Sequence, residues 1–374
     1  MQFIDLKSQF NAIQEDIRKR MDTVLQHGQF IMGPEVKELE QQLAGYVGVK
    51  HAISCSSGTD AILLALMAYG VGPGDAVFTT PFTFIATAEV ISLLGATPVF
   101  IDIDAQSYNI DPRKLDATIA NFSYPQLKPK GIIAVDLFGL PAEYTAINDI
   151  AHKHDLFVIE DGAQSFGAEY HGRKACALAD IGCTSFFPAK PLGCFGDGGM
   201  CFTDDDTLAG IMGSLRVHGA GVHKYDNERI GINGRLDTLQ AAILLSKFAI
   251  FPEEVEKRNR AASQYNDLLG QGSAQLALPS FFDNMTSVWA QYSILAKDTD
   301  HRAQIQAALK EEGVPSAIYY PRPLHLQKAF SSLGYKKGDF PVSEACADRI
   351  FSLPMHPYLD INDQKKIADI INRL

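Results

Sequence analysis

The stretch 156-LFVIED-161 decides the fold, because four consecutive apolar residues end in two acids. A strand covered on both faces is apolar throughout, whereas a strand with one face in water alternates apolar and polar residues. Leu156–Glu160 therefore predicts a central strand of a parallel sheet. Asp161 directly follows, so we expect its carboxylate at the carboxyl edge of the sheet, where water solvates it poorly.

Short apolar runs alternate with helical patterns on both sides of this stretch. The predicted strands are His51–Cys55, Ala76–Thr80, Pro98–Ile103, Gly131–Phe138, Leu156–Glu160 and Met200–Thr203, and the predicted helices are Asp60–Tyr69, Ile85–Leu94, Ala142–His154 and a segment near Asp206–Val217. This alternation is typical of an α/β fold in which helices cover a mostly parallel sheet on both faces.

The length of the chain allows one large domain and a smaller companion. A helical tract from Thr238 to about Leu269 is expected to break near Pro252, and the rest mixes short strands, helices and prolines. We predict a large domain at residues 1–250 and a smaller α+β domain at residues 251–374. The N-terminal segment is expected to pack on the smaller one.

The charge and hydropathy of the chain exclude several classes of protein. Its 374 residues carry a net charge of −11, with 46% hydrophobic and 21% charged residues. The negative charge argues against nucleic acid or an anionic membrane as the main partner, and it still allows an anionic small molecule in a local pocket. The sequence has no apolar run of about 18 residues and no secretion signal at its start, so we expect a cytoplasmic protein.

The cysteines and histidines show no metal-binding pattern. The six cysteines form no CxxC pair and the ten histidines no HExxH motif. Buried reduced thiols are therefore a simpler interpretation than a disulfide framework or a zinc site. We expect no metal.

Small polar residues, 56-SSGTD-60, follow the strand His51–Cys55 and precede a helix. Backbone N–H groups at the N-terminus of a helix form a phosphate site. Serine, threonine and aspartate also simply cap helices, and that interpretation fits this segment equally well when it is taken alone.

A second stretch, 185-SFFPAKPLGCFGDGG-199, places one lysine, Lys190, among prolines and glycines. Proline fixes φ and glycine opens conformations that are closed to other residues, so the segment predicts a shaped loop. A lysine held in such a loop cannot easily extend into water. A desolvated amine has a lowered pKa and becomes nucleophilic toward carbonyl groups.

The segment 56–60, Asp161 and Lys190 together indicate one kind of site, although each alone is ambiguous. An ionised Asp161 at the end of a buried strand needs a cationic partner, although it could instead cap the next turn, and Gln164 could be an ordinary surface amide. Pyridoxal 5′-phosphate needs a lysine for covalent attachment, an acid opposite its ring nitrogen and anchors for its phosphate. The set therefore predicts pyridoxal 5′-phosphate as the cofactor.

The order of these motifs resembles the DegT/StrS group of pyridoxal-phosphate-dependent nucleotide-sugar aminotransferases. The resemblance covers nearly the whole chain, and it implies the fold-type-I architecture of aspartate aminotransferase. It rests on 28-GQFIMGPEVKELE-40, 54-SCSSGTDAILLAL-66, 81-PFTFIATA-88, 98-PVFIDID-104, 159-IEDGAQSFGA-168, 185-SFFPAKPLGCFGDGG-199, 233-NGRLDTLQAA-242, 319-YYPRPLHLQ-327 and 353-LPMHP-357. The segment 121-NFSYPQLKPK-130 looks longer than usual in the group, and we expect a surface excursion there.

The resemblance implies a role for each matching residue. Lys190 would bind the cofactor covalently and move a proton between substrate and cofactor, Asp161 would pair with the ring nitrogen, and Gln164 would contact the ring hydroxyl. Phe84 would stack on the ring, although without the resemblance it would be taken for a core phenylalanine. Three residues would bind the phosphate: Gly58, Thr59 and Ser185.

Asn233 matches the asparagine with which members of the group reach the phosphate of the neighbouring subunit's cofactor. The resemblance thus implies a homodimer with shared active sites. The alternative for Asn233 is a turn residue within Ile232–Gly234, since Asn-Gly makes turns without any other function.

The resemblance also implies the reaction. Members with histidine in place of the lysine run dehydrations, so Lys190 favours transamination, with L-glutamate and 2-oxoglutarate as the donor pair and a keto-sugar nucleotide as the acceptor. The loop after Lys190 resembles members that aminate C-3 of the sugar. The expected acceptor is UDP-2-acetamido-3-keto-glucuronate, and the product would be a precursor of O-antigen or other polysaccharide in lipopolysaccharide biosynthesis.

A uronate acceptor carries a carboxylate, and Arg235 lies beside Asn233 in the sequence. An arginine fork suits bidentate recognition of a carboxylate, although Arg235 could instead pair with Asp237 on a helix surface. His218, Tyr319, Tyr320 and His325 are further candidates for substrate contacts, and any of them could be a locally packed loop residue.

Two alternatives stay open. The first is the same chemistry on a 3-keto-6-deoxyhexose or a 4-keto sugar nucleotide. The second is a regulatory protein that binds pyridoxal phosphate or a nucleotide without turnover, and the intact set of Lys190, Asp161 and Gln164 argues against it.

Overall fold

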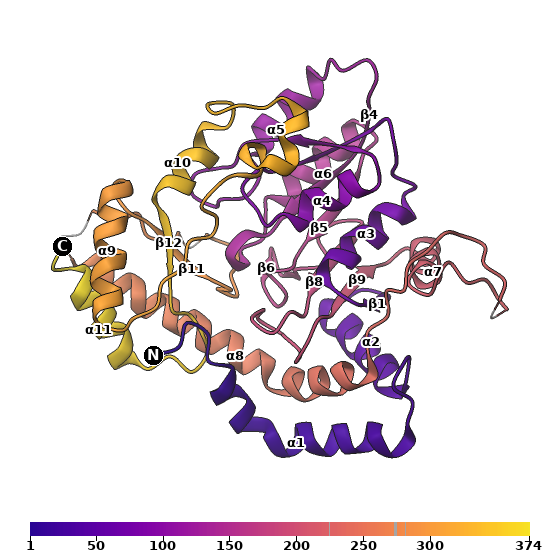
Figure 1. The fold of residues 1–374 in the computed structure, drawn as a ribbon, viewed down its shortest axis with the longest axis horizontal. Coiled ribbons are helices and arrows are strands. Elements are labelled where there is room, and N and C mark those ends of the chain that lie inside the picture. The colour runs from indigo at the N-terminus through magenta and orange to yellow at the C-terminus, as the bar shows by residue number, and fades with distance from the viewer. Residues whose placement is uncertain (224, 273–274, 281) are drawn as a thin grey trace.

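A seven-stranded sheet forms the centre of the computed structural model, which describes residues 1–223, 225–272, 275–280 and 282–374 (Figure 1). The strands run in the order β1-β9-β8-β5-β4-β2-β3. They are β1 (His51–Cys55), β2 (Asp75–Thr79), β3 (Thr97–Phe100), β4 (Lys128–Val135), β5 (Phe157–Asp161), β8 (Ile181–Ser185) and β9 (Gly199–Thr203). All pairs are parallel except those that β9 makes with β1 and β8. The predicted α/β fold with a mostly parallel sheet is confirmed.

Strand β5 occupies the middle of the sheet, as its apolar sequence predicts. All five of its residues are buried. It pairs in parallel with β4, where Val135 lies opposite Asp161, and with β8, where Ile181 lies opposite Ile159. This register brings the carboxyl ends of three strands together at Asp161.

Helices cover the sheet on both faces. They are α2 (Pro34–Val47), α3 (Gly58–Ala68), α4 (Ala86–Leu93), α5 (Pro112–Ala120), α6 (Tyr144–Lys153) and α7 (Asp206–Leu215), together with the start of α8 (Thr238–Gly270). Ile62 and Leu66 of α3 pack with Ile159 on one face, and Ile147 of α6 packs with Val158 on the other. The alternation of apolar and helical segments in the sequence arises from this double cover.

A smaller group of elements lies at one end of the molecule (Figure 1). It contains β11 (Tyr292–Leu295), β12 (Ile350–Leu353), α9 (Thr299–Glu311), α10 (Pro341–Arg349) and α11 (Ile361–Ile371). The 3₁₀ helices η2 (Leu324–Leu326) and η3 (Lys328–Leu333) lie instead against the large sheet, where Leu324 and Phe330 pack with Ala88 of α4 and Phe100 of β3. A third 3₁₀ helix, η1 (Leu137–Gly139), follows β4, and a small sheet joins β10 (Met285–Thr286), β6 (Glu169–Tyr170) and β7 (Arg173–Lys174).

Helix α8 runs from the large sheet to this smaller group, with α1 (Leu6–His27) alongside it (Figure 1). The N-terminal segment reaches the smaller group, where the carbonyl oxygen of Phe3 accepts a hydrogen bond of 3.2 Å from the N–H of Met355. The predicted boundary at residue 250 falls inside α8, so the division into domains at 1–250 and 251–374 stays a prediction.

Helix α8 continues through Pro252, which corrects the expected break there. Proline removes one backbone donor and crowds the preceding turn. Packing on both sides of the proline outweighs this cost, because Phe251 before it and Ala262 and Tyr265 after it are buried in two different apolar clusters. Tertiary packing supplies most of the stability of a helix in a folded protein.

The segment 121–130 connects α5 to β4, and its last three residues already belong to that strand. Tyr124 is half exposed, and Phe122 packs edge-on against Phe78 of the core. Within the residues that the structure describes, no helix is long and apolar enough to cross a membrane.

Candidate active site

A cavity of about 450 Å³ opens where the carboxyl ends of the parallel strands meet. Parallel sheets place ligands at this edge because the strand ends and helix N-termini converge there. The predicted site residues that line it are Gly58, Thr59, Phe84, Asp161, Gln164, Ser185, Lys190, Tyr319 and Tyr320. The structure thus brings together side chains from segments more than 250 residues apart in the sequence.

One end of the cavity is suited to a phosphate. Ser57 caps α3 by accepting a hydrogen bond of 3.0 Å from the N–H of Asp60, so the capping interpretation of this segment is also correct. A Cβ on Gly58 would lie 2.6 Å from that of Ser185, and only glycine allows this close approach. The first N–H groups of α3 and the hydroxyl of Ser185 therefore lie side by side, which is the arrangement that binds an anion.

Asp161 lies at the other end of the cavity, only 6% exposed. Burial raises the pKa of its carboxyl, while a hydrogen bond from Thr87, the charge of Lys190 and the N–H of Ala163 oppose that rise. The Thr87 hydroxyl donates to Oδ2 over 2.7 Å, and the N–H of Ala163 donates to Oδ1 over 3.3 Å. The carboxylate is thus held in one orientation with its charge poorly solvated.

Lys190 enters the cavity from the predicted loop, which joins β8 to β9. The loop turns tightly: the N–H of Lys190 donates to the carbonyl of Phe187 over 2.9 Å, and a Cβ on Gly193 would lie 2.6 Å from that same oxygen. Burial lowers the pKa of the Lys190 amine, and the charge of Asp161 opposes this only in part. A lowered pKa increases the fraction of neutral amine, the form that reacts with a carbonyl group.

Gln164 and two aromatic residues complete the wall. The Gln164 side chain accepts a hydrogen bond of 2.7 Å from the N–H of Phe138 and donates one of 3.2 Å to the hydroxyl of Tyr320. Phe84 is 56% exposed, and its ring lies 6.4 Å from that of Tyr320. Phe84 is therefore not a core residue, and its ring face is available to a ligand.

Four predicted residues do not line the cavity of this chain. Asn233 and His218 are exposed on a loop in which Val217 pairs with Asn233. Arg235 is partly buried, and its Nε has no hydrogen-bond partner among the described residues. Their roles stay predictions.

His325 is packed away from the cavity. Its ring is buried, with Nε2 3.0 Å from Oε1 of Glu344 and the Phe340 ring 4.7 Å away. His325 does not line the cavity, and its Nδ1 is buried without a hydrogen-bond partner among the described residues. Its contact with a substrate stays a prediction.

Several cavity residues were missed by the sequence analysis: Ile4, Thr83, Thr87, Asp197 and Gln291. The two threonines lie within the quoted motif 81-PFTFIATA-88, and their four-residue spacing at the start of α4 was the signal that could have found them. Ile4 and Gln291 carried no local signal, because tertiary structure alone brings the N-terminus and the segment before β11 to the cavity.

The donor set matches pyridoxal 5′-phosphate. An anion site made by α3 and Ser185, a buried carboxylate and an amine of lowered pKa occupy one cavity. The carboxylate suits the ring nitrogen, the amine suits the aldehyde, and the exposed Phe84 suits a flat ring. Fold and site together define the class of an enzyme that binds this cofactor at the edge of a parallel sheet.

Comparison with known proteins agrees with this class. The family model described as the DegT/DnrJ/EryC1/StrS aminotransferase family matches residues 11–372. The UDP-2-acetamido-2-deoxy-3-oxo-D-glucuronate aminotransferase of Pseudomonas aeruginosa is 49% identical over 98% of both chains. A "pleiotropic regulatory protein" of Geobacillus stearothermophilus is 44% identical over 98% of this chain and 96% of its own.

Solved structures show the same relationship. A DegT/DnrJ/EryC1/StrS aminotransferase from Brucella abortus superposes with a TM-score of 0.94 at 48% identity, covering 99% of this chain and 98% of its own. NtdA from Bacillus subtilis, solved with bound cofactor PMP, gives a TM-score of 0.90 at 30% identity, covering 100% of this chain and 85% of its own. The chain belongs to the DegT/DnrJ/EryC1/StrS aminotransferase family. The predicted family, fold class and aminotransferase class are confirmed.

Proposed function

We propose that this protein uses pyridoxal 5′-phosphate to transfer the amino group of L-glutamate to C-3 of UDP-2-acetamido-3-keto-glucuronate. The observation that carries the proposal is the cavity itself, which is lined by Lys190, by Asp161 and by the α3 anion site. The similarity to the 3-oxo-glucuronate aminotransferase of P. aeruginosa along the whole chain supports this acceptor.

The phosphate group would be held by the N–H groups of Gly58 and Thr59 and by the hydroxyl of Ser185. The partial positive charge at the N-terminus of α3 adds to these donors. Because Gly58 has no side chain, the backbone of α3 can approach Ser185 closely enough for both to reach one anion.

Asp161 would keep the ring nitrogen protonated, and Phe84 would cover one face of the ring. When bound, the cofactor supplies an aldehyde that takes up the amino group and a ring that withdraws electrons from the reacting carbon. Thr87 supports this role of Asp161 by stabilising the charged form of the carboxylate.

Lys190 would act twice. Its amine would hold the cofactor covalently through the aldehyde carbon, with loss of water, and as a free amine it would carry a proton to and from the reacting carbon of the substrate. The lowered pKa of the amine suits both tasks, because the neutral amine is both the nucleophile and the base.

A homodimer with shared active sites would complete the cavity. Asn233 is exposed and lies outside the cavity of its own chain, as expected if it reaches the phosphate of the partner's cofactor. Exposed apolar side chains cluster in two segments near these loops: Phe30, Ile31 and Met32 are 41–46% exposed, and Val222 and Ile230 about 90%. A surface of this kind is typical of a protein–protein interface.

Arg235 would bind the carboxylate of a uronate acceptor. Its buried Nε lacks a partner among the described residues, so the guanidinium has donor capacity left for a ligand. His218, Tyr319 and Tyr320 would contact the sugar or nucleotide. The product would serve cytoplasmic synthesis of O-antigen or related polysaccharide.

Two other functions make different predictions. The same residues would aminate a 3-keto-6-deoxyhexose or a 4-keto sugar if the uronate carboxylate were not recognised. The second function is that of a regulator without turnover, as the name of the G. stearothermophilus relative suggests for that protein. Such a regulator would not convert the cofactor to its amine form with glutamate.

An assay of the reverse reaction separates these possibilities. The purified protein is incubated with 2-oxoglutarate and a panel of amino-sugar nucleotides, and glutamate formation is measured. We expect turnover of the 3-amino-uronate. Turnover of non-carboxylated hexoses alone would refute the uronate acceptor and leave the aminotransferase activity intact. In a separate measurement, glutamate is added to the protein with bound cofactor. Absence of any change in the cofactor's absorbance would then refute the enzyme activity.

A further inference from the structure

A left-handed residue orients the amide of Gln164. Phe138, in η1 directly after β4, has φ 60° and ψ 7°. This left-handed conformation is strained for a non-glycine residue, and such strain persists only where the surroundings enforce it. In return, the N–H of Phe138 donates a hydrogen bond of 2.7 Å to Oε1 of Gln164.

That hydrogen bond decides which end of the amide reaches the cavity. With Oε1 accepting from Phe138, the NH₂ group of Gln164 is the end that donates to Tyr320 over 3.2 Å. Gln164 is 5% exposed and lines the cavity, so the orientation of its amide fixes a donor there. A ring hydroxyl of the cofactor, when ionised, requires a donor rather than an acceptor.

Asn109 holds the backbone around Phe138 in place from both ends. Its Oδ1 accepts a hydrogen bond of 2.8 Å from the N–H of Leu137, and its Nδ2 donates one of 2.9 Å to the carbonyl of Leu140. The side chain is 1% exposed, so neither end of the amide is exchanged with water. Both hydrogen-bonding functions of Asn109 are therefore used on the three-residue turn that carries Phe138.

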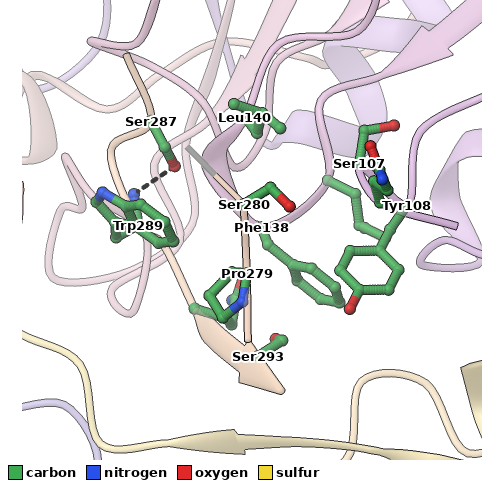
Figure 2. A pocket seen from close by; sticks show the side chains of 12 residues that line it. Ser107, Tyr108, Phe138, Leu140, Pro279, Ser280, Ser287, Trp289 and Ser293 are labelled. Carbon is green, nitrogen blue, oxygen red and sulfur yellow. Dashed lines mark hydrogen bonds between the residues drawn. The ribbon is translucent and has the colours of Figure 1, made fainter. Parts of the chain in front are cut away.

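Aromatic packing supports the same turn from the other side (Figure 2). Figure 2 shows the ring of Phe138 beside that of Tyr108, with Trp289 on the other side of a small cavity. The volume of this cavity is about 30 Å³. The Phe138 and Tyr108 rings lie 5.5 Å apart at 70°. A Cβ on Gly139 would lie 2.9 Å from the backbone nitrogen of Trp289, so the segment before β11 closes the turn tightly.

We propose that Asn109 is a positioning residue for the cofactor ring, acting through Phe138 and Gln164. It does not line the cavity, so it would act through other residues. It keeps the N–H of Phe138 at Gln164, which keeps the NH₂ of Gln164 directed into the cavity. The proposal rests on the function proposed above, in which Gln164 meets the ring hydroxyl.

The test is a double-mutant cycle on cofactor binding. Apoprotein is prepared for the wild type, Asn109→Asp, Gln164→Ala and the double variant, and the Kd for pyridoxal 5′-phosphate is measured by titration. Asn109→Asp keeps the acceptor for Leu137 and places a carboxylate oxygen against the carbonyl of Leu140. We expect about a tenfold higher Kd in the wild-type background and less than about a twofold effect in Gln164→Ala.

A spectroscopic titration adds a readout that a purely structural residue would not change. The pH at which the absorbance of the bound cofactor changes is expected to shift in Asn109→Asp. The matched control is Asn148→Leu, which removes another asparagine-to-carbonyl hydrogen bond, that of Asn148 to Leu178 over 2.9 Å. The control should change the melting temperature without shifting the titration.

The outcomes separate this inference from the proposed function. If Asn109→Asp raises Kd equally in both backgrounds, or if the control shifts the titration as much, Asn109 is only a structural residue and the inference fails. If the wild-type apoprotein does not bind pyridoxal 5′-phosphate, the proposed function fails first. A Kd effect that disappears in Gln164→Ala supports both.

Discussion

Thr87 donates its hydroxyl to Oδ2 of Asp161 over 2.7 Å, and Thr83 continues the chain with a hydroxyl–hydroxyl distance of 3.1 Å to Thr87. Both threonines are nearly fully buried. Asp161 therefore depends on Thr87, the second residue of α4, for the stability of its charge. The sheet supplies the acid, and a helix start supplies its support.

Replacement of Thr87 by valine should slow the reaction with glutamate. Valine keeps the shape and removes the donor, so the pKa of Asp161, already raised by burial, should rise further. A hydrogen bond to a charged group contributes about 1.5–3 kcal/mol, so we expect a rate about 10- to 100-fold lower in stopped-flow measurements. Thr87→Ser is the control and should stay close to the wild type. A normal rate in Thr87→Val would show that the charge of Asp161 is stable without the hydrogen bond from Thr87.

Lys190 should be the site of covalent attachment, with a pH dependence that reflects its burial. Because desolvation lowers the pKa of its amine, attachment of pyridoxal 5′-phosphate should reach half of its limiting rate at a pH below 10.5. The measurement traps the adduct with borohydride at each pH and maps the labelled peptide. Lys190→Arg should fold and remain unlabelled, because a guanidinium stays protonated. Label on another lysine would contradict the assignment.

Asp136 and Glu160 predict a loss of stability at higher pH. Both carboxyls are fully buried, that of Asp136 directly after β4 and that of Glu160 on the neighbouring β5. Burial raises both pKa values, that of Asp136 to about 6. A carboxyl whose folded pKa exceeds its unfolded value stabilises the fold at low pH and loses that contribution as pH rises through the folded pKa. The free energy of unfolding of the wild type should thus fall as pH rises from 3.8, the ordinary pKa of an aspartate, through about 6, and Glu160 should extend this fall to higher pH.

The matched variant for this prediction is Asp136→Asn. Asparagine can still accept from Tyr144, which donates over 2.9 Å, and it no longer titrates. Its unfolding free energy, from urea denaturation, should depend less on pH across about pH 6. If the unfolding free energy changes equally with pH in the two proteins, ionisation of Asp136 does not cause the loss of stability.

Arg235→Ala should damage use of a uronate more than use of glutamate. Loss of a charge-assisted bidentate contact costs about 1.5–3 kcal/mol, so kcat/KM for the keto-uronate should fall about 10- to 100-fold relative to the glutamate half-reaction. The two half-reactions are measured separately. Equal losses in both would make Arg235 a structural residue or a glutamate ligand.

Mixed dimers should recover activity if the sites are shared. Lys190→Arg and Asn233→Ala are each expected to be inactive, but half of the dimers in an equal, fully exchanged mixture would contain one site with both native residues. About a quarter of the wild-type activity should therefore return. No recovery, despite subunit exchange confirmed by mass spectrometry, would place Asn233 in the site of its own chain.

The main parts of the site could be predicted because each follows from local sequence. The apolar run before Asp161 predicts a buried strand that ends at this acid, and the prolines and glycines around Lys190 predict a loop. Neither prediction needs tertiary information. The hydrogen bonds of Asn109 could not be predicted, because they join residues 28 and 31 positions apart whose proximity depends on strand order. The contact between His325 and Glu344 could not be predicted for the same reason, because these residues lie 19 positions apart and only the fold brings them together.

All six cysteines fall within the described chain, and all are buried as free thiols. The pKa of each is raised, at Cys201 mainly by a hydrogen bond with Cys183 and at the other five by burial. A raised pKa suppresses the thiolate that alkylating reagents attack. In the folded protein, these thiols should therefore not react with maleimides or iodoacetamides. One cysteine introduced on an exposed loop would carry a fluorophore at a single known position, and the native thiols would take up label only as the chain opens.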